Sequence, residues 1–112
     1  MNIQIETSVQ ATVVRIMGSV DGMTADSLLQ QLQAQIAQGS IQLVGDLSGV
    51  DYTSSAGLRT LLATVKETRR LGGDFRLAAV QPDVLKVLEL SGFTSILRVF
   101  GDVDSAVASF GS

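Results

Sequence analysis

The sequence contains no cysteine, no histidine and a single proline. Without histidine, a Ser-His-Asp catalytic relay cannot be assembled. Without cysteine, disulfides and thiolate metal sites are excluded, which is typical of a cytoplasmic chain. The acidic residues do not converge in the pattern that an all-carboxylate cation site needs. We therefore expect no metal, no cofactor and no enzymatic activity of the chain itself.

Segments that commonly bind nucleotides, nucleic acids or membranes are missing as well. There is no G-x-x-x-x-G-K-S/T loop, and Gly18 and Gly22 do not form a dinucleotide fingerprint. The net charge is −3, and the densest basic stretch, residues 66–70, includes Glu67, so no nucleic-acid partner is expected. No apolar run approaches the roughly 18 residues of a membrane span. The chain also does not open with a basic segment followed by an apolar one. We expect a cytoplasmic protein without membrane insertion.

The apolar residues that are present suit one domain of strands and helices. They make up 46% of the 112 residues, which is enough for one buried core over residues 1–112. Alternating or continuous apolar runs predict strands, and apolar residues at helical spacing predict helices. The strands are expected at residues 3–9, 11–17, 41–47, 75–80 and 96–100, and the helices begin near residues 24, 55, 82 and 103. Residues 8–10 are expected to form the short hairpin link between the first two strands.

The resulting order of elements, β-β-α-β-α-β-α-β-α, predicts an α/β fold. Strands separated by helices pair in parallel through right-handed crossovers, whereas the first two strands form an antiparallel hairpin. In such a mixed, mostly parallel sheet, sites form beyond the carboxyl ends of the parallel strands. The loop at residues 21–24 and the hinge at residues 51–55 both follow such ends. We therefore expect these two segments to meet in space.

Individual residues predict how several helices begin. Thr24 is expected to cap the first helix with its hydroxyl. Pro82 suits the first turn of the third helix, where its missing N–H is not needed. The rest of that helix, residues 84–90, is too densely apolar for a free surface helix, so we expect it to pack closely. Asp102 or Asp104 is expected to cap the last helix.

The most chemically specific stretch is Val50-Asp51-Tyr52-Thr53-Ser54-Ser55-Ala56-Gly57-Leu58, a hinge between a buried strand and an amphipathic helix. Ser54 or Ser55 can cap this helix, which is the most common role of serine at such a position. A hydroxyl there can also carry a phosphate, which would meet unpaired backbone N–H groups and the positive end of the helix dipole. Capping and switching are compatible, so the hinge is a candidate phosphorylation switch.

Acidic residues indicate what such a phosphate would do. Asp21, Asp46 and Asp51 are expected near the hinge, and the phosphate would add to the negative charge of this surface. A partner fitted to the neutral surface would lose affinity through repulsion and desolvation. Asp46 and Asp51 could also be read as an acid–base pair, but no cleft or substrate for proton transfer is implied. The charges favour a release switch over an internal change of shape.

Three segments resemble the STAS-domain family, specifically the bacterial anti-sigma factor antagonists (anti-anti-sigma factors). Residues 46–58, Asp-Leu-Ser-Gly-Val-Asp-Tyr-Thr-Ser-Ser-Ala-Gly-Leu, look like the signature D-L-S-x-V-x-[FY]-[ILM]-D-S-[ST]-G-[LV]. Residues 18–25 look like the G-x-L-D-x-x-T-A segment of the family, and residues 88–93 like its L-x-x-x-G-[LF] helix end. The resemblance covers essentially the whole chain and implies a single STAS domain.

The resemblance also implies a regulatory cycle. The unphosphorylated form would bind an anti-sigma factor with serine-kinase activity, which frees a sigma factor for transcription. The kinase would then phosphorylate the antagonist and the complex would separate, until a serine phosphatase resets it. By position, Ser55 matches the phosphorylated serine of the family, and Asp21 matches an acid close to that serine.

The match departs from the family pattern beside this serine. Ser54 stands where the family often has aspartate, which leaves a second acceptor hydroxyl, and Ala56 replaces a common serine or threonine. Ser55 is the first choice because it matches by register from Asp46 and from Gly57. Ser54 is the second, and Thr53, where the family prefers an apolar residue, is a distant third. The residues expected to contact the partner are Asp21, Gly22, Met23, Thr24, Asp51, Tyr52, Thr53, Ser54, Ala56 and Gly57.

Two other functions are alternatives. The first is a STAS subunit that docks on and stabilises the ATPase of a lipid-transport ABC complex, where the serine would be a contact and not a switch. Co-purification with a membrane-associated ATPase would favour it. The second is a small enzyme or nucleotide-binding domain, although histidine, cysteine and a phosphate loop are missing. Tight nucleotide binding by the isolated chain would support the second.

Overall fold

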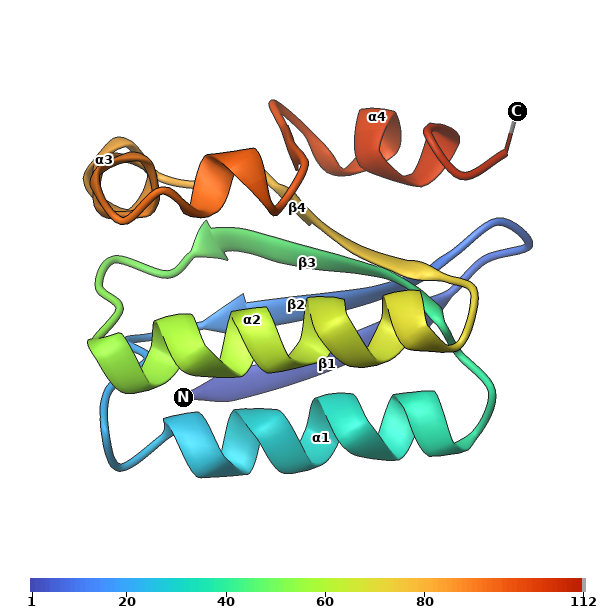
Figure 1. Cartoon of the computed structure of the whole chain (residues 1–112), viewed down its shortest axis with the longest axis horizontal. Helices are drawn as coiled ribbons and strands as arrows, with labels where there is room; N and C mark the ends of the chain where they lie inside the picture. Colours follow the sequence, from blue (N-terminus) through green and yellow to red (C-terminus); the bar gives the residue numbers. More distant parts are fainter. Residues whose placement is uncertain (112) are drawn as a thin grey trace.

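Strands and helices follow one another in the order that the sequence predicts. The structure is a computed structural model that describes residues 1–111 (Figure 1). The strands are β1 (Asn2–Thr7), β2 (Thr12–Met17), β3 (Gln42–Gly49), β4 (Asp74–Ala78) and β5 (Val99–Phe100). The helices are α1 (Ala25–Ala37), α2 (Ser55–Arg70), α3 (Pro82–Leu90) and α4 (Val103–Ala108), and a short 3-10 helix, η1, spans Phe93–Ser95.

The strands form one mixed sheet in the order β1-β2-β3-β4-β5. β1 pairs antiparallel with β2, so that Ile3 lies opposite Ile16, and each later pair is parallel. The carboxyl ends of β2, β3 and β4 therefore point to the same end of the sheet (Figure 1). The predicted α/β class with an antiparallel first strand is confirmed.

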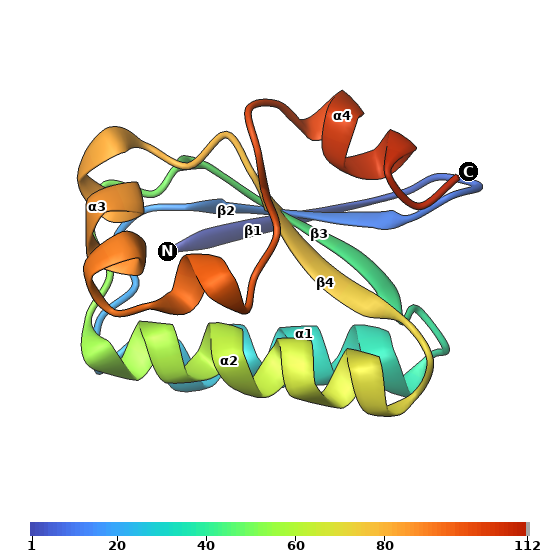
Figure 2. The same ribbon diagram turned by 45° about the horizontal axis from the view of Figure 1, so that its top comes forward.

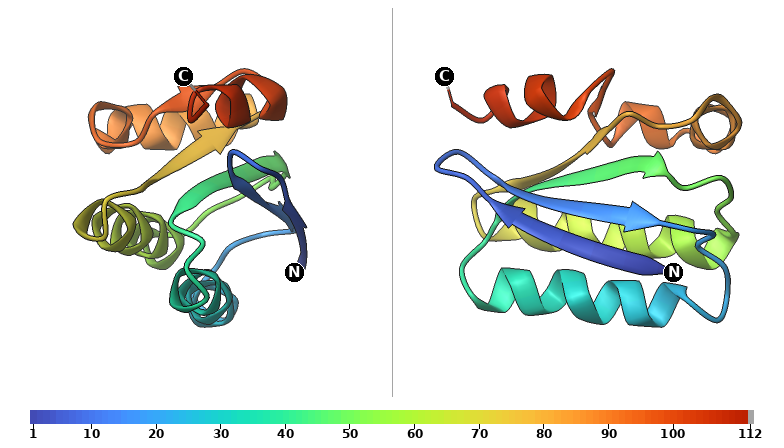
Figure 3. Two further views of the ribbon diagram at one scale, coloured as in Figure 1. Left: turned by 90° about the vertical axis from the view of Figure 1, so that its right-hand side faces the viewer. Right: turned by 180° about the vertical axis from the view of Figure 1, so that it is seen from behind.

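The helices cover both faces of the sheet. α1 and α2 lie side by side on one face, and α4 covers the other face (Figures 2 and 3). α3 lies near the carboxyl end of β3 and contributes Val84 and Leu88 to the core of the α1 and α2 face. The larger core fills the α1 and α2 face, where Leu32 and Val65 pack with Phe75. A smaller core lies under α4, where Ala106 packs on Val44. Burying apolar area on both faces leaves the ends of the sheet open for a site.

The first hairpin turns earlier than the apolar pattern suggests. β1 ends at Thr7, and Val9, which was expected in the strand, lies fully exposed in the turn. The hydroxyl of Ser8 donates to the carbonyl of Ala11 (2.8 Å) and accepts from the N–H of the same residue (3.2 Å). The predicted hairpin link at residues 8–10 is therefore confirmed, whereas counting Val9 in the strand pattern was wrong, because these local bonds compete with strand pairing.

The last strand is also shorter than expected. Residues 96–100 were predicted as a strand, but only Val99–Phe100 forms one. It follows the 3-10 helix at Phe93–Ser95. The guanidinium of Arg69 donates to the carbonyl of Ile96 (2.6 Å), so a side chain, and not a neighbouring strand, binds this group.

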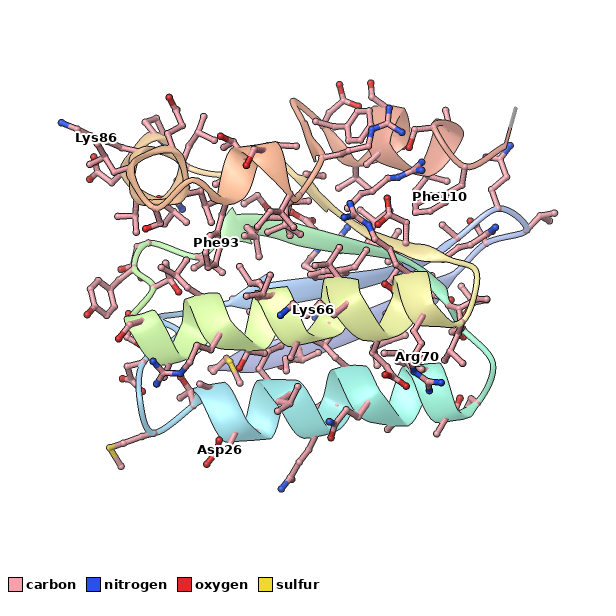
Figure 4. All side chains as sticks on the ribbon, in the orientation of Figure 1. Asp26, Lys66, Arg70, Lys86, Phe93 and Phe110 are labelled. Atoms are coloured by element: carbon pink, nitrogen blue, oxygen red, sulfur yellow. The ribbon has the colours of Figure 1, made fainter. Side chains whose placement is uncertain are left out.

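α3 packs through one side only, which corrects the expectation of close packing. Val84 and Leu88 are buried in the core, whereas Leu90 is 79% exposed and Val87 is 37% exposed. A short helix at the end of a sheet can turn only one side inward. Val87 and Leu90 therefore lie on the surface, on the same helix as the outward-pointing Lys86 (Figure 4).

α4 is fixed by charged contacts at both of its ends. The carboxylate of Asp102 accepts from the N–H of Ser105 (2.7 Å), which confirms Asp102 as its cap. Arg76 donates to Asp74 (2.9 Å) and lies over the ring of Phe110, 3.9 Å from its centroid. These contacts hold α4 at the end of the sheet away from the carboxyl end of β3 (Figure 1).

Candidate functional site

Backbone hydrogen bonds join the loop after β2 to the hinge after β3. The N–H of Val20 donates to the carbonyl of Tyr52 (2.9 Å), and the N–H of Ser54 donates to the carbonyl of Val20 (2.8 Å). Val20 and Thr53 thereby form an isolated parallel bridge beyond the two strands. Both segments lie where α1 and α2 begin, at the left of Figure 1. The prediction that these loops meet is confirmed.

Asp21 organises the loop that leads into α1. Its carboxylate accepts from the N–H groups of Met23 (2.9 Å) and Thr24 (3.0 Å), and these bonds lower the pKa of Asp21. Thr24 was expected to cap α1 with its hydroxyl, and this was wrong. The hydroxyl instead accepts from the N–H of Asp21 (2.9 Å) and donates to the carbonyl of Ser19 (3.1 Å). Threonine therefore closes the loop, and the aspartate binds the free N–H groups.

Ser54 and Ser55 have different surroundings at the start of α2. Ser54 is half-buried and caps the helix, because its hydroxyl accepts from the N–H of Gly57 (3.2 Å). Ser55 is the first helical residue and is exposed. Its hydroxyl makes no hydrogen bond within residues 1–111. Of the two serines, Ser55 is therefore the more exposed and the one whose hydroxyl has no hydrogen-bond partner among the described residues.

The first turn of α2 also offers backbone N–H groups to an anion. The N–H of Gly57 is bound by Ser54, and the N–H of Ser54 is bound by Val20. The N–H groups of Ser55 and Ala56 lie at positions that an α-helix cannot satisfy internally, at the positive end of its dipole. A negative charge on the Ser55 hydroxyl can therefore be accommodated without breaking the cap.

Gly57 allows α2 to approach the loop at Val20. A Cβ at residue 57 would lie 2.9 Å from Cγ1 of Val20 and 3.1 Å from its carbonyl oxygen, and it would collide with the hydroxyl of Thr53. Gly57 is buried, so it supports this junction from within. The sequence does not distinguish this packing role from a contact role, because both favour a residue without a side chain.

Most other residues expected to contact a partner lie at the surface. Met23 is 91% exposed and Tyr52 is 53% exposed, which is high for large apolar and aromatic side chains. Gly22 and Asp51 are exposed, and the half-buried members are Asp21, Thr24, Thr53, Ser54 and Ala56. Methionine and aromatic side chains are enriched in protein interfaces. The chemistry of this surface therefore suits a protein partner.

Asp46 does not belong to the acidic surface, which corrects the sequence interpretation. It is 3% exposed, and its carboxylate accepts from the guanidinium of Arg15 (2.9 Å) and the N–H of Ser48 (3.0 Å). Burial on its own would raise the pKa of Asp46, but these bonds outweigh it and lower the pKa. The acids that remain on the two joined loops are Asp21 and Asp51.

A groove of about 190 Å³ extends the surface from the hinge to α3. It is lined by Asp51, Tyr52 and Thr53 of the hinge and by Asp83, Val84 and Val87 of α3. The amide of Gln81 donates to the carbonyl of Ser48 (2.8 Å) and ties the start of α3 to the end of β3. This part of the surface was not predicted from the sequence. The signal was the apolar excess of α3, which was interpreted as core packing.

The described part of the chain was also compared with the requirements of a metal site and of a membrane span. Among residues 1–111, no group of histidine, cysteine, aspartate and glutamate side chains is arranged to hold a metal ion. Within the same residues, every helix is too short or too polar to cross a membrane. The candidate site is therefore a hydroxyl at a helix start, set in a surface suited to protein contact.

Known proteins resemble this chain over nearly its whole length. The STAS domain family model matches residues 2–106. A Bordetella bronchiseptica protein named as an anti-sigma factor antagonist, BtrV, is 39% identical over 95 residues, which cover 85% of this chain and 82% of that protein. An anti-sigma F factor antagonist of Paenibacillus polymyxa is 27% identical over 110 residues, covering 96% and 94% of the two chains. The structure of an anti-sigma factor antagonist from Mycobacterium paratuberculosis matches with a TM-score of 0.90 and 28% identity, covering 99% and 94%. The chain belongs to the STAS domain family.

Proposed function

We propose that this protein is an anti-sigma factor antagonist that is switched by phosphorylation of Ser55. The unphosphorylated form binds an anti-sigma factor with serine-kinase activity, and this binding frees a sigma factor. The kinase transfers the terminal phosphoryl group of ATP to the Ser55 hydroxyl, ADP is released and the complex separates. A serine phosphatase hydrolyses the phosphoester and restores the binding form. The chain itself is a binding module and a substrate.

The observation that carries this proposal is the division of roles between the two serines. The hydroxyl of Ser54 is engaged in the cap, whereas Ser55 is exposed on a junction that backbone bonds to Val20 hold in place. A kinase can therefore reach Ser55 without undoing the start of α2. The relatives named as antagonists favour this function over a docking subunit of a transport ATPase.

Electrostatics supplies the release step. A phosphate on Ser55 adds about −1.5 to −2 charge at pH 7. The joined loops, residues 18–25 and 50–58, already carry Asp21 and Asp51 and contain no lysine or arginine. A partner that covers the exposed Met23 and Tyr52 would have to desolvate this charge. Affinity falls through repulsion and desolvation, without a large change of shape.

Phosphorylation by a cognate anti-sigma kinase tests the proposal. With ATP, the wild type and Ser54→Ala are expected to gain one phosphate, which mass spectrometry places on Ser55. Ser55→Ala is expected to gain none, while its circular dichroism spectrum stays that of the folded protein. Phosphate found on Ser54 alone would refute the proposed site. Failure to bind any anti-sigma kinase would refute the partner class.

A further inference from the structure

The arginines of α2 differ in the partners that they have. Arg69 donates to Asp74 (2.8 Å), and Arg70 pairs with Glu67 one turn before it (2.6 Å). Arg59 is exposed, and it forms no ion pair within residues 1–111. The guanidinium nearest to the start of the helix is thus the one without a charged partner.

The neighbours of Arg59 along the helix explain why it has none. In an α-helix, side chains contact those three and four residues away. For Arg59 these positions are Ala56, Leu62, Ala63 and Ser55. Alanine and leucine carry no charge, and Ser55 carries one only when it is phosphorylated. The sequence therefore leaves a single position from which an anion on α2 could reach this guanidinium.

The direction of helical side chains favours the same pair. The Cα–Cβ bonds of a helix lean toward its N-terminus, so the side chain of Arg59 extends over the turn that contains Ser55. Both residues are exposed, whereas Leu58 and Thr60 are buried, which places Ser55 and Arg59 on one outward face. An anion four residues before a cation is also the more favourable order. Guanidinium groups match phosphate oxygens with two parallel hydrogen bonds.

We propose that Arg59 binds the phosphate of phosphorylated Ser55 and so holds it against the outer face of α2. This inference rests on the proposed phosphorylation of Ser55 and concerns the regulation of the same site. Arg59 is a positioning residue here. Its guanidinium pairs with the phosphate only when Ser55 is phosphorylated, and the pair favours the doubly ionised form of that phosphate. Asp21 and Asp51 on the adjoining loops carry carboxylates that oppose this ionisation. Asp26 does the same from α1, which packs against this part of α2 where the hydroxyl of Thr60 donates to the carbonyl of Ala25 (3.3 Å). The pair of Arg59 and the phosphate acts against these three charges.

Phosphorus NMR on protein carrying phosphoserine at position 55, introduced during translation, tests the pair. The pKa of the phosphate is expected to be lower with Arg59 present than in Arg59→Gln, by about 0.3 pH unit at low salt. The difference should shrink at about 1 M salt, since the pair is exposed to solvent. Asp21, Asp26 and Asp51 are unchanged in both proteins, so their repulsion cancels in the comparison.

Lys66→Gln is the matched control. Lys66 lies farther along the exposed side of α2 (Figure 4), and its replacement removes the same unit of charge. It is expected to leave the phosphate pKa close to that of the wild type. Equal pKa values with and without Arg59, or an equal effect of Lys66→Gln, would overturn the inference. The NMR experiment uses no kinase, so its result does not depend on the labelling experiment. A negative NMR result would refute only the role of Arg59, whereas a negative labelling result would refute the proposed function.

Discussion

The N–H of Ser54 donates to the carbonyl of Val20 across 2.8 Å, so the cap of α2 is fixed to the loop that follows β2. Val20 also donates to the carbonyl of Tyr52 (2.9 Å), which holds the hinge on both sides of Thr53. The position of Ser55 is therefore set by contacts between two strand ends. A modified residue on such a rigid support changes the charge of the surface more than its shape.

Replacing Ser54 by alanine is expected to lower the free energy of unfolding by about 1 kcal/mol, because the N–H of Gly57 loses its partner. Ser55→Ala, at an exposed position without a side-chain bond, should change it by less than about 0.5 kcal/mol. Urea denaturation of the two variants measures the difference. Equal losses would contradict the assignment of the cap to Ser54.

Gly57→Ala is expected to destabilise the junction, because the added Cβ would press on Val20 and Thr53. Overpacking typically costs about 1–3 kcal/mol, against a gain of about 1 kcal/mol from the helix propensity of alanine. Gly22→Ala is the control, since a Cβ there would meet nothing within 4 Å. Thermal denaturation should show a lower midpoint for Gly57→Ala alone. An unchanged or higher midpoint would argue against the close approach.

The stability that Asp46 contributes is expected to depend on pH. Burial acts to raise its pKa, but the bonds from Ser48 and Arg15 lower it below the ordinary value. Such a group binds fewer protons in the folded state, so it stabilises above the unfolded pKa of about 3.9. This contribution is lost as the pH falls through the folded pKa.

Asp46→Asn should therefore lower the free energy of unfolding at pH 7, and its difference from the wild type should narrow below about pH 4. Denaturation between pH 7 and pH 3 checks this. Glu89→Gln, at an exposed position on α3, removes the same charge and is expected to have little effect. If the free energies of unfolding of Asp46→Asn and the wild type differ by the same amount at every pH, the ionised carboxylate does not have the proposed role.

Leu88 and Leu90 test the orientation of α3. Leu88 is fully buried and Leu90 is 79% exposed, although they are the same residue type two positions apart. Leu88→Ala should cost about 2–5 kcal/mol of unfolding free energy, and Leu90→Ala should cost less than about 0.5 kcal/mol. Chemical denaturation of both variants measures this. A large loss for Leu90→Ala would mean that α3 is turned the other way.

The fold and the meeting of the two loops were predictable because several local signals agree. Apolar periodicity set the order of elements, and the rule for carboxyl ends of parallel strands placed residues 21–24 beside residues 51–55. The bridge between Val20 and Thr53 is the structural counterpart of that rule. Local apolar patterns and one general rule of sheet topology were therefore sufficient for the architecture.

Details that depend on contacts between elements were not predictable. The partner of Asp46 is Arg15, which stands opposite it on the adjacent strand, so only the strand register reveals the ion pair. Thr24 has the residue type of a cap, but its hydroxyl binds the preceding loop. Leu90 is as apolar as Leu88, and composition does not show which of them faces the core.

The affinity of the anti-sigma factor partner for phosphorylated and unphosphorylated protein tests the central claim most directly. Isothermal titration calorimetry should show binding at least about tenfold weaker when phosphoserine occupies position 55. Phosphoserine at position 105, exposed on α4, adds the same charge elsewhere and is expected to leave the affinity unchanged. Equal affinity of the unmodified protein and the protein phosphorylated at Ser55 would contradict the switch.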